Sequence, residues 1–184
     1  MVQPIYIYRV QLTDEGFKIQ EELSYEEFTS RMSNTAELRS NPNALSNGDF
    51  SFTTPGGNTY DVAGHAMQNN GGAHGAVEQS GPGFIWEGDA YCVTQFTENE
   101  SRAVVGWEIT DNTQLPPPLD VGFYIYTAVE DNGEGSNAPS DRVSLNFYIA
   151  PPGSPAFCDV LANDASWPEE NWVDVNEGGH IQVQ

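Results

Sequence analysis

Three histidines of this chain could in principle ligate a metal: His65, His74 and His180. One metal-binding pattern of β-rich enzymes is H-x-H followed shortly by Glu. Here His65 is followed by Ala66 and Met67, so that spacing is missing. His65 and His74 also stand in a Gly- and Asn-rich stretch. The pattern favours solvated or loop-packed imidazoles over metal ligands.

Motifs for a nucleophile or for phosphate binding are also missing. The sequence holds no G-x-S-x-G, the motif that places a catalytic serine on a strand-to-helix turn. The runs GGNT and NNGGAHGA lack the lysine and the strand-to-helix setting of a phosphate loop. We therefore predict that the protein is not an enzyme and uses no cofactor.

Cys92 and Cys158 are the only cysteines, 66 positions apart in the sequence. Neither belongs to a C-x-x-C motif or to a Cys/His cluster with zinc spacing. Two interpretations stay open: buried free thiols, or a disulfide within one chain or between chains. A disulfide within the chain would contribute about 4 kcal/mol through the entropy of the closed loop.

The stretch EDNGEGSNAPSD, residues 130–141, gathers oxygen-bearing side chains between two apolar runs. A calcium loop of the pattern D-x-[DN]-x-[DN]-G would need oxygen ligands where Gly133 and Gly135 stand. We therefore predict a hairpin loop in which Val129 ends one strand and Val143 begins its partner. The carboxylates of this loop are expected to stay hydrated.

Cation binding by the same stretch stays open as an alternative. The side chains that offer oxygen are Asp131, Asn132, Glu134, Asn137 and Asp141. Spacing alone does not decide whether Asp131, Glu134 or Asp141 binds a cation.

The tryptophans could form a platform on which sugar rings stack. Tryptophans inside strands or beside a short helix more often pack in the core, however. Trp86 and Trp107 lie inside predicted strands, and Trp167 and Trp172 flank a predicted short helix. We expect all four to pack in the core, with the last two holding the helix against a sheet.

Alternation of apolar and polar residues, with turn residues between the runs, predicts about nine short strands. The first contains Ile5, Ile7, Val10 and Leu12. The other expected strands are DFSFTT, TYDVAG, GFIWEG, AYCVTQF, RAVVGWEIT, DVGFYIYTAVE, RVSLNFYIA and HIQVQ. The runs IYIY and FYIY are apolar on both faces, which suggests that something besides this chain, such as a neighbouring subunit, buries one face of each.

Two short helices are expected between the strands. In LSYEEFTSRM, Ser24 and Glu27 have the spacing of a capping box. In SWPEENWV, Ser166 and Glu169 repeat that spacing, with a proline in the first turn. The Gly-, Asn- and Gln-rich segment 64–83 is expected to form one long loop.

Together these elements predict an all-β fold: a single jelly-roll or antiparallel β-sandwich of about 8–9 strands with one or two short helices. A parallel sheet would need regularly alternating helices, which the sequence does not offer. No repeat and no shift in composition marks a second domain, so residues 1–184 are expected to form one.

The net charge of -21 comes from 27 carboxylates against six cations. The cations are Arg9, Lys18, Arg31, Arg39, Arg102 and Arg142. A surface this negative repels phosphate, so direct contact with nucleic acid is not expected. One lysine in the whole chain, with carboxylates spread along it and not gathered in a tail, indicates an environment of molar salt.

The first residues, MVQPIYIYRVQLTDEG, alternate like a strand and show neither a basic nor an apolar region of a secretory signal. No run approaches 18 apolar residues, the length that spans a bilayer. We therefore expect synthesis in the cytoplasm and no membrane-spanning segment.

Five features together resemble the smaller major capsid protein of tailless icosahedral haloarchaeal viruses with an internal membrane. The features are the strand QPIYIYRVQL, the strand pair DVGFYIYTAVE and RVSLNFYIAPP, the two cysteines Cys92 and Cys158, the length, and the acidic, nearly lysine-free composition. The resemblance spans most of the chain, but no short motif in it is specific to that family.

The resemblance implies an upright single jelly-roll in the capsid of a virion. Such a subunit packs with a larger homologous capsid protein and with copies of itself into pseudo-hexameric capsomers around a membrane vesicle. Disulfides link capsid subunits in such relatives, which would give Cys92 or Cys158 a role. The alternative function is that of a binding module: a carbohydrate-binding or cell-surface β-sandwich module of a halophile. In such a module Asn99-Glu100-Ser101 would be an N-glycosylation site.

Salt should stabilise this fold. The net charge of -21, spread over a sphere of radius about 26 Å, repels itself by about 10 kcal/mol at 0.1 M salt and about 4 kcal/mol at 1 M. Since the unfolded chain keeps part of this repulsion, the free energy of unfolding should rise by at most about 6 kcal/mol between these two concentrations. Thermal melts in KCl measure the rise, with NaCl as a control that should act alike. An unchanged melting temperature would contradict the electrostatic argument.

Overall fold

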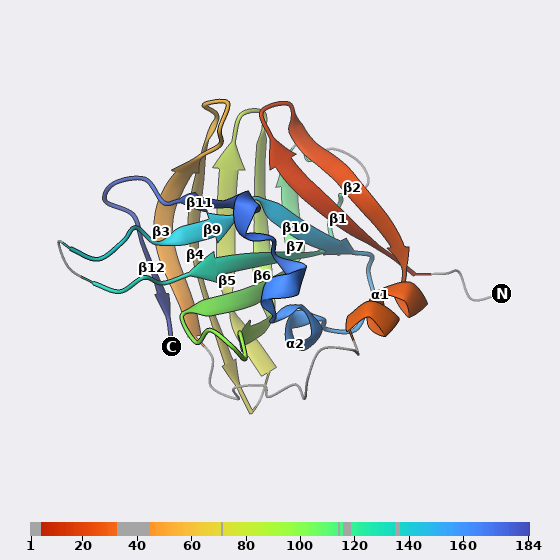
Figure 1. The fold of residues 1–184 in the computed structure, drawn as a ribbon. Helices are drawn as coiled ribbons and strands as arrows, with labels where there is room; N and C mark the ends of the chain where they lie inside the picture. The colour runs from red at the N-terminus through yellow and green to blue at the C-terminus, as the bar shows by residue number, and fades with distance from the viewer. Residues whose placement is uncertain (1–4, 33–44, 71, 114, 116–118, 135–136) are drawn as a thin grey trace.

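The structure, a computed structural model, describes residues 5–32, 45–70, 72–113, 115, 119–134 and 137–184. Within these ranges twelve strands form one antiparallel sheet, accompanied by two short α-helices and two 3-10 turns (Figure 1). The all-β antiparallel fold with two short helices is therefore confirmed. The strands outnumber the 8–9 expected, since β2, β5 and β11 were not anticipated.

The strands are β1 (Tyr6–Thr13), β2 (Gly16–Ser24), β3 (Leu45–Thr53), β4 (Thr59–Asn69), β5 (Gly72–Gly81), β6 (Phe84–Gln95), β7 (Arg102–Thr113), β8 (Tyr124–Glu130), β9 (Arg142–Ser144), β10 (Asn146–Ala150), β11 (Trp172–Asp174) and β12 (His180–Val183). The helices are α1 (Tyr25–Met32) and α2 (Cys158–Leu161), and the 3-10 turns are η1 (Asp164–Ser166) and η2 (Glu169–Asn171).

The sheet runs in the order β12-β3-β4-β5-β6-β7-β8-β10-β1-β2, with β9 beside β8 and β11 beside β9. From β3 to β8 each strand pairs with the next one in the sequence, so this part is a succession of hairpins. Two irregularities interrupt the pairing of β6 with β7, between Glu87 and Gly88 and between Ala90 and Cys92. Such bulges bend strands and let a sheet fold over on itself.

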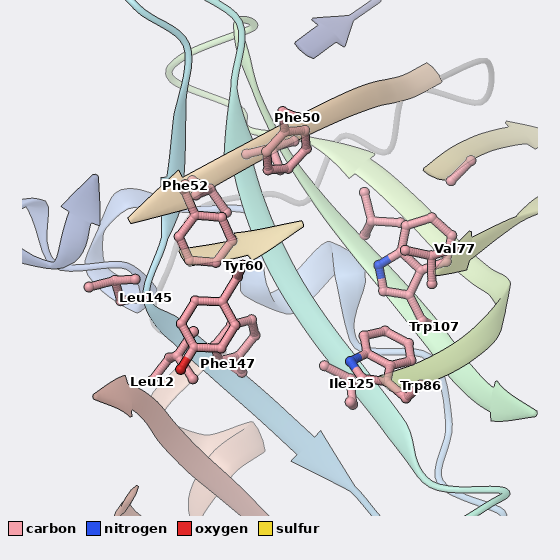
Figure 2. Close-up of a cluster of buried hydrophobic side chains, with 14 of the residues drawn as sticks. Leu12, Phe50, Phe52, Tyr60, Val77, Trp86, Trp107, Ile125, Leu145 and Phe147 are labelled. Carbon is pink, nitrogen blue, oxygen red and sulfur yellow. The ribbon is translucent and has the colours of Figure 1, made fainter. Parts of the chain in front are cut away.

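Figure 1 shows the result of that bend: β3, β4 and β5 run upright, whereas β7, β8 and β10 cross in front of them. An isolated bridge between Phe52 and Val175 joins the β3 edge to the residues after β11. The two layers therefore enclose a first core, which includes Phe52, Tyr60, Trp86, Ile125 and Phe147 (Figure 2).

A second core lies on the other face of β7, β8 and β10. It includes Phe28 of α1, Leu161 of α2 and Trp167, packed against Tyr126 and Tyr148 of the sheet. Strands β8 and β10 are thus buried on both faces, as their nearly uniform burial shows. This explains why their sequences read as continuous apolar runs instead of alternating.

The suggestion that another subunit buries one face of FYIY is wrong. Ile125 faces the first core, whereas Tyr124 and Tyr126 lie in the second core, under the helical segments of the same chain. In IYIY, Ile7 is likewise buried in the second core, and only Tyr6 is as much as 38% exposed. The chain covers its own apolar strands with α1 and the C-terminal helical residues.

The long loop expected at 64–83 is also wrong, because the segment forms most of the β4–β5 hairpin. Its Gly and Ala residues have low intrinsic strand preference, but pairing with β3 on one side and β6 on the other holds them extended. Gly75 adopts a φ of 138°, and a side chain there would collide with the backbone of His65. These glycines let neighbouring backbones approach closely.

The capping box of α1 is confirmed. Glu27 Oε2 accepts a hydrogen bond from the Ser24 N–H at 3.0 Å, and Ser24 Oγ accepts one from the Glu27 N–H at 3.3 Å. The second expected helix is only the single turn η2, and no side-chain cap precedes it. Glu169 instead turns its carboxylate towards two arginines of the sheet.

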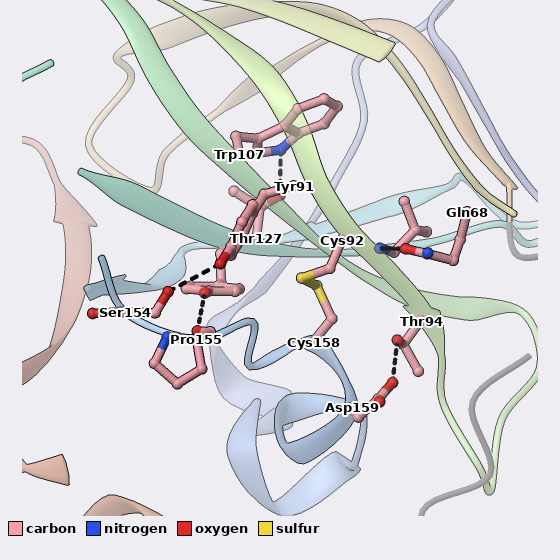
Figure 3. The surroundings of a disulfide bond; sticks show 12 residues. Gln68, Tyr91, Cys92, Thr94, Trp107, Thr127, Ser154, Pro155, Cys158 and Asp159 are labelled. Atoms are coloured by element: carbon pink, nitrogen blue, oxygen red, sulfur yellow. Dashed lines mark hydrogen bonds between the residues drawn. A yellow bond between two sulfur atoms is a disulfide. The ribbon is translucent and has the colours of Figure 1, made fainter. Parts of the chain in front are cut away.

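Cys92 of β6 and Cys158 of α2 form a disulfide within the chain (Figure 3). Free thiols and a bond between chains, the other interpretations left open by the sequence, are therefore wrong for this structure. The bond ties the helical layer to the sheet beside the second core. It closes a loop across 66 positions of sequence, which restricts the unfolded chain.

Replacing both cysteines by alanine should lower the free energy of unfolding by about 2–5 kcal/mol. Chemical denaturation in molar KCl measures the loss, and the oxidised protein treated with a reductant should reach the same value as the double variant. A double variant as stable as the parent would contradict a stabilising bond between the sheet and α2.

Candidate functional site: an ion-pair cluster and an acidic sheet face

Two arginines and two glutamates form a closed cluster where β7, β8, β9 and η2 meet. Arg102 donates from Nε to Glu130 at 3.0 Å and from a terminal nitrogen to Glu169 at 2.8 Å. Arg142 donates to the same two carboxylates. Both guanidinium groups lie over the ring of Trp172, at 4.6 Å and 5.6 Å from its centroid. Each acid therefore meets both bases, and an aromatic ring covers the arginines.

The cluster is buried on the sheet side and open on the η2 side. Arg102 is 6% exposed and Glu130 is 4% exposed, whereas the Glu169 side chain is 61% exposed. Burial alone would raise the pKa of Glu130, but hydrogen bonds from Arg142 and Arg102 outweigh it and hold the pKa below its ordinary value. The same two arginines lower the pKa of Glu169.

This arrangement is suited to holding elements together and not to proton transfer. Two positive and two negative groups balance one another, and both carboxylates are kept ionised at neutral pH. Sequence reasoning missed the cluster, although a signal was present. Arg102 and Arg142 each begin a strand, and both pair in register with Glu130, which ends the strand between them.

The predicted hairpin pairing of Val129 with Val143 is present. The expectation of hydrated carboxylates is wrong for Asp131 and Asp141, however. Asp141 accepts backbone hydrogen bonds from Asn132 at 2.8 Å and from Ile181 at 2.6 Å.

Asp131 works in the same way, accepting backbone hydrogen bonds from Gly133 at 2.7 Å and from Val183 at 3.0 Å. The two aspartates therefore bind N–H groups of β12, whose pairing partner within the described residues is β3 alone. An unpaired strand edge is a template for aggregation, and these carboxylates occupy part of it. Glu134 is exposed.

Carboxylates also line up across the outer face of β5, β6 and β7. Glu78 pairs directly with Glu87, and Glu87 pairs directly with Asp111. All three side chains are exposed. Like charges directly opposite each other on neighbouring strands destabilise a sheet. This row is a local source of the repulsion that salt must screen.

The three histidines do not come together with such acids to make a metal centre. His65, His74 and His180 are exposed on β4, β5 and β12. Among the described residues, no group of three or more His, Cys, Asp or Glu side chains has the geometry to hold a metal ion.

The tryptophans lie in the core, as predicted. Trp86 and Trp107 belong to the first core, and Trp167 and Trp172 to the second. Trp167 donates its indole N–H to the backbone oxygen of Leu161 at 2.7 Å, which ties it to α2. With exposures of 1% and 8%, Trp167 and Trp172 cannot form a platform for sugar rings.

Comparison with known proteins identifies no family for this chain: no family model matches it, and no curated protein or solved structure is significantly similar to it. Among the described helices, none is long and apolar enough to cross a membrane.

Acid should weaken the fold through the ion-pair cluster. Because the folded-state pKa values of Glu130 and Glu169 lie below their unfolded values, their stabilisation is full above the unfolded pKa of about 4.3. It is lost as the pH falls through the folded values. Glu130→Gln should cost about 3–5 kcal/mol, since it removes the buried carboxylate that balances the buried guanidinium of Arg102, whereas Glu169→Gln should cost about 1 kcal/mol or less.

Thermal melts in molar KCl from pH 7 to pH 3 measure both effects. The Glu130→Gln variant should lose stability less steeply with acid than the parent. Exposed Glu134→Gln is the matched control and should leave the profile unchanged. Equal costs for the two cluster variants would contradict the burial argument.

Proposed function

We propose that this protein is a structural subunit of a virion shell that assembles in concentrated salt, beside copies of itself and a larger homologous capsid protein. The proposal takes up the resemblance to the smaller major capsid proteins of haloarchaeal viruses with an internal membrane. Two properties support it: an edge strand that pairs on one side only within the described residues, and a surface so negative that copies can approach one another only in salt that screens the charge.

The free edge of β2 is the observation that carries the assembly. Within the described residues β2 pairs with β1 alone, although it is nine residues long. Ile19, near its middle, is 50% exposed. The opposite end of the sheet differs, because Asp131 and Asp141 occupy N–H groups of β12. A long edge strand left open at one end of the sheet, with a blocked edge at the other end, fits a subunit that joins a neighbour in one direction.

The charge distribution supports the salt requirement and the absence of nucleic acid among the partners. A chain with a net charge of -21 cannot approach DNA phosphates or copies of itself without screening. The row Glu78, Glu87 and Asp111 concentrates that repulsion on one face. A membrane between shell and genome would remove any need for contact with nucleic acid.

The carbohydrate-binding alternative has no comparable support. Its platform was expected on tryptophan rings, and the four tryptophans are at most 8% exposed.

Electron microscopy and sedimentation in 3 M KCl test the proposal. The parent protein should form regular assemblies that dissociate on dilution to about 0.1 M salt, where the screening length grows from under 3 Å to about 10 Å. Ile19→Glu on the free edge should raise the concentration needed for assembly by about tenfold, the usual effect of one anchor residue.

Ile85→Glu is the matched control for this test. Ile85 is 48% exposed, but it lies on β6, which is paired on both sides. Assembly should therefore survive this change. A parent protein that stays monomeric at every salt concentration would contradict the proposed function, and equal effects of the two variants would contradict the β2 edge as the contact.

A further inference from the structure

A cavity lies inside the first core, between the two layers of the sheet. About 40 Å³ is open there to the centre of a water-sized molecule. Its walls come from nine strands and include Phe50, Phe52, Trp86, Trp107 and Phe147. Figure 2 shows several of these side chains around the interior, with both tryptophans on one side. One water needs about 10–15 Å³ by a similar measure, so the space exceeds a single water.

Two polar side chains on the wall have unused hydrogen-bonding capacity. The indole N–H of Trp86 has no partner among the described residues, although Trp86 is 1% exposed. Gln79 is 4% exposed, and its carboxamide hydrogen-bonds to no other described residue. The two residues are direct partners in the β5–β6 pairing and both line the cavity. They form a polar pair on one apolar wall.

Buried polar groups without partners are rare in folded proteins, because each loses its hydrogen bonds to water. Trp107 is satisfied in the usual way, because its indole N–H donates a hydrogen bond to Thr127 Oγ1 at 3.4 Å. The indole N–H of Trp86 departs from this pattern, although β5 and β6 are continuously paired around it. An apolar pocket with a few unpaired polar groups is the usual design of a small-molecule site.

The lining also defines the class of ligand. It contains no charged side chain, so an ion would enter without a counter-charge. Trp86 can only donate a hydrogen bond, whereas the Gln79 amide can both donate and accept. We propose that this cavity binds a small uncharged molecule in which an apolar part is joined to a hydroxyl or carbonyl group, with the polar group against Gln79 and Trp86. The proposal is independent of the shell function.

Two glycines keep space open beside this site. A side chain at Gly48 would approach the Phe50 ring to 2.9 Å, and one at Gly64 would approach Val77 to 3.0 Å. Both glycines line the cavity. A larger residue at either glycine would force the neighbouring side chain, Phe50 or Val77, to move.

Nuclear magnetic resonance of the full chain, labelled with ¹⁵N at its tryptophans, tests the site with 1-propanol as the probe in 3 M KCl. The Trp86 indole resonance is assigned from a Trp86→Phe spectrum. This resonance should shift saturably as the probe binds and its hydroxyl oxygen accepts a hydrogen bond from the Trp86 indole N–H. Gln79→Met, which keeps the length of the side chain, should weaken binding about fivefold to tenfold, the effect of one hydrogen bond.

Trp167→Phe is the matched control, because Trp167 lies in the second core, does not line the cavity, and already has the Leu161 backbone oxygen as an acceptor for its N–H. It should bind the probe as the parent does, and its thermal melt shows whether it is folded. The proposal would be overturned if the Trp86 resonance showed no saturable shift on addition of the probe. It would also be overturned if the Trp86 N–H contacted bound water alone and not the probe. Equal binding by the parent and Gln79→Met would also overturn it, because apolar room would then suffice.

Discussion

The scarcity of positive charge is the constraint on which the rest of this structure depends. Five of the six cations lie within the described residues, and four of these pair with glutamates. Two of the four are used at one place, the cluster around Trp172. There they join three strands and the C-terminal turn that carries Glu169. Most of the 27 carboxylates must therefore find other partners or remain in water.

Backbone N–H groups take the place of the missing cations. Asp14 accepts a hydrogen bond from the Gly56 N–H at 2.9 Å, which joins the β1–β2 turn to the β3–β4 turn. Glu27 caps α1 in the same way, and Asp131 and Asp141 bind β12. A carboxylate that accepts N–H bonds keeps its charge without a counter-ion nearby. This use of acids explains how a chain so poor in lysine can still order its turns and edges.

The sequence was most informative where local chemistry decides the outcome. The capping box at Ser24 and the pairing of Val129 with Val143 depend on neighbouring residues and were predictable. The β4–β5 hairpin was not, because its glycines and alanines are extended only through contacts with β3 and β6. The partners of Glu169 and Asp141 were equally hidden. They meet residues far along the chain, which only the folded sheet brings together.

Strands β5 and β6 connect the electrostatics of the surface with the interior of the protein. Glu78 and Glu87 oppose each other on the outer face, and Gln79 and Trp86 oppose each other one residue away on the inner face. Since successive side chains of a strand point to opposite sides, both pairs act on the same stretch of backbone. The acidic row outside and the polar pair inside therefore share the same continuously paired backbone of β5 and β6.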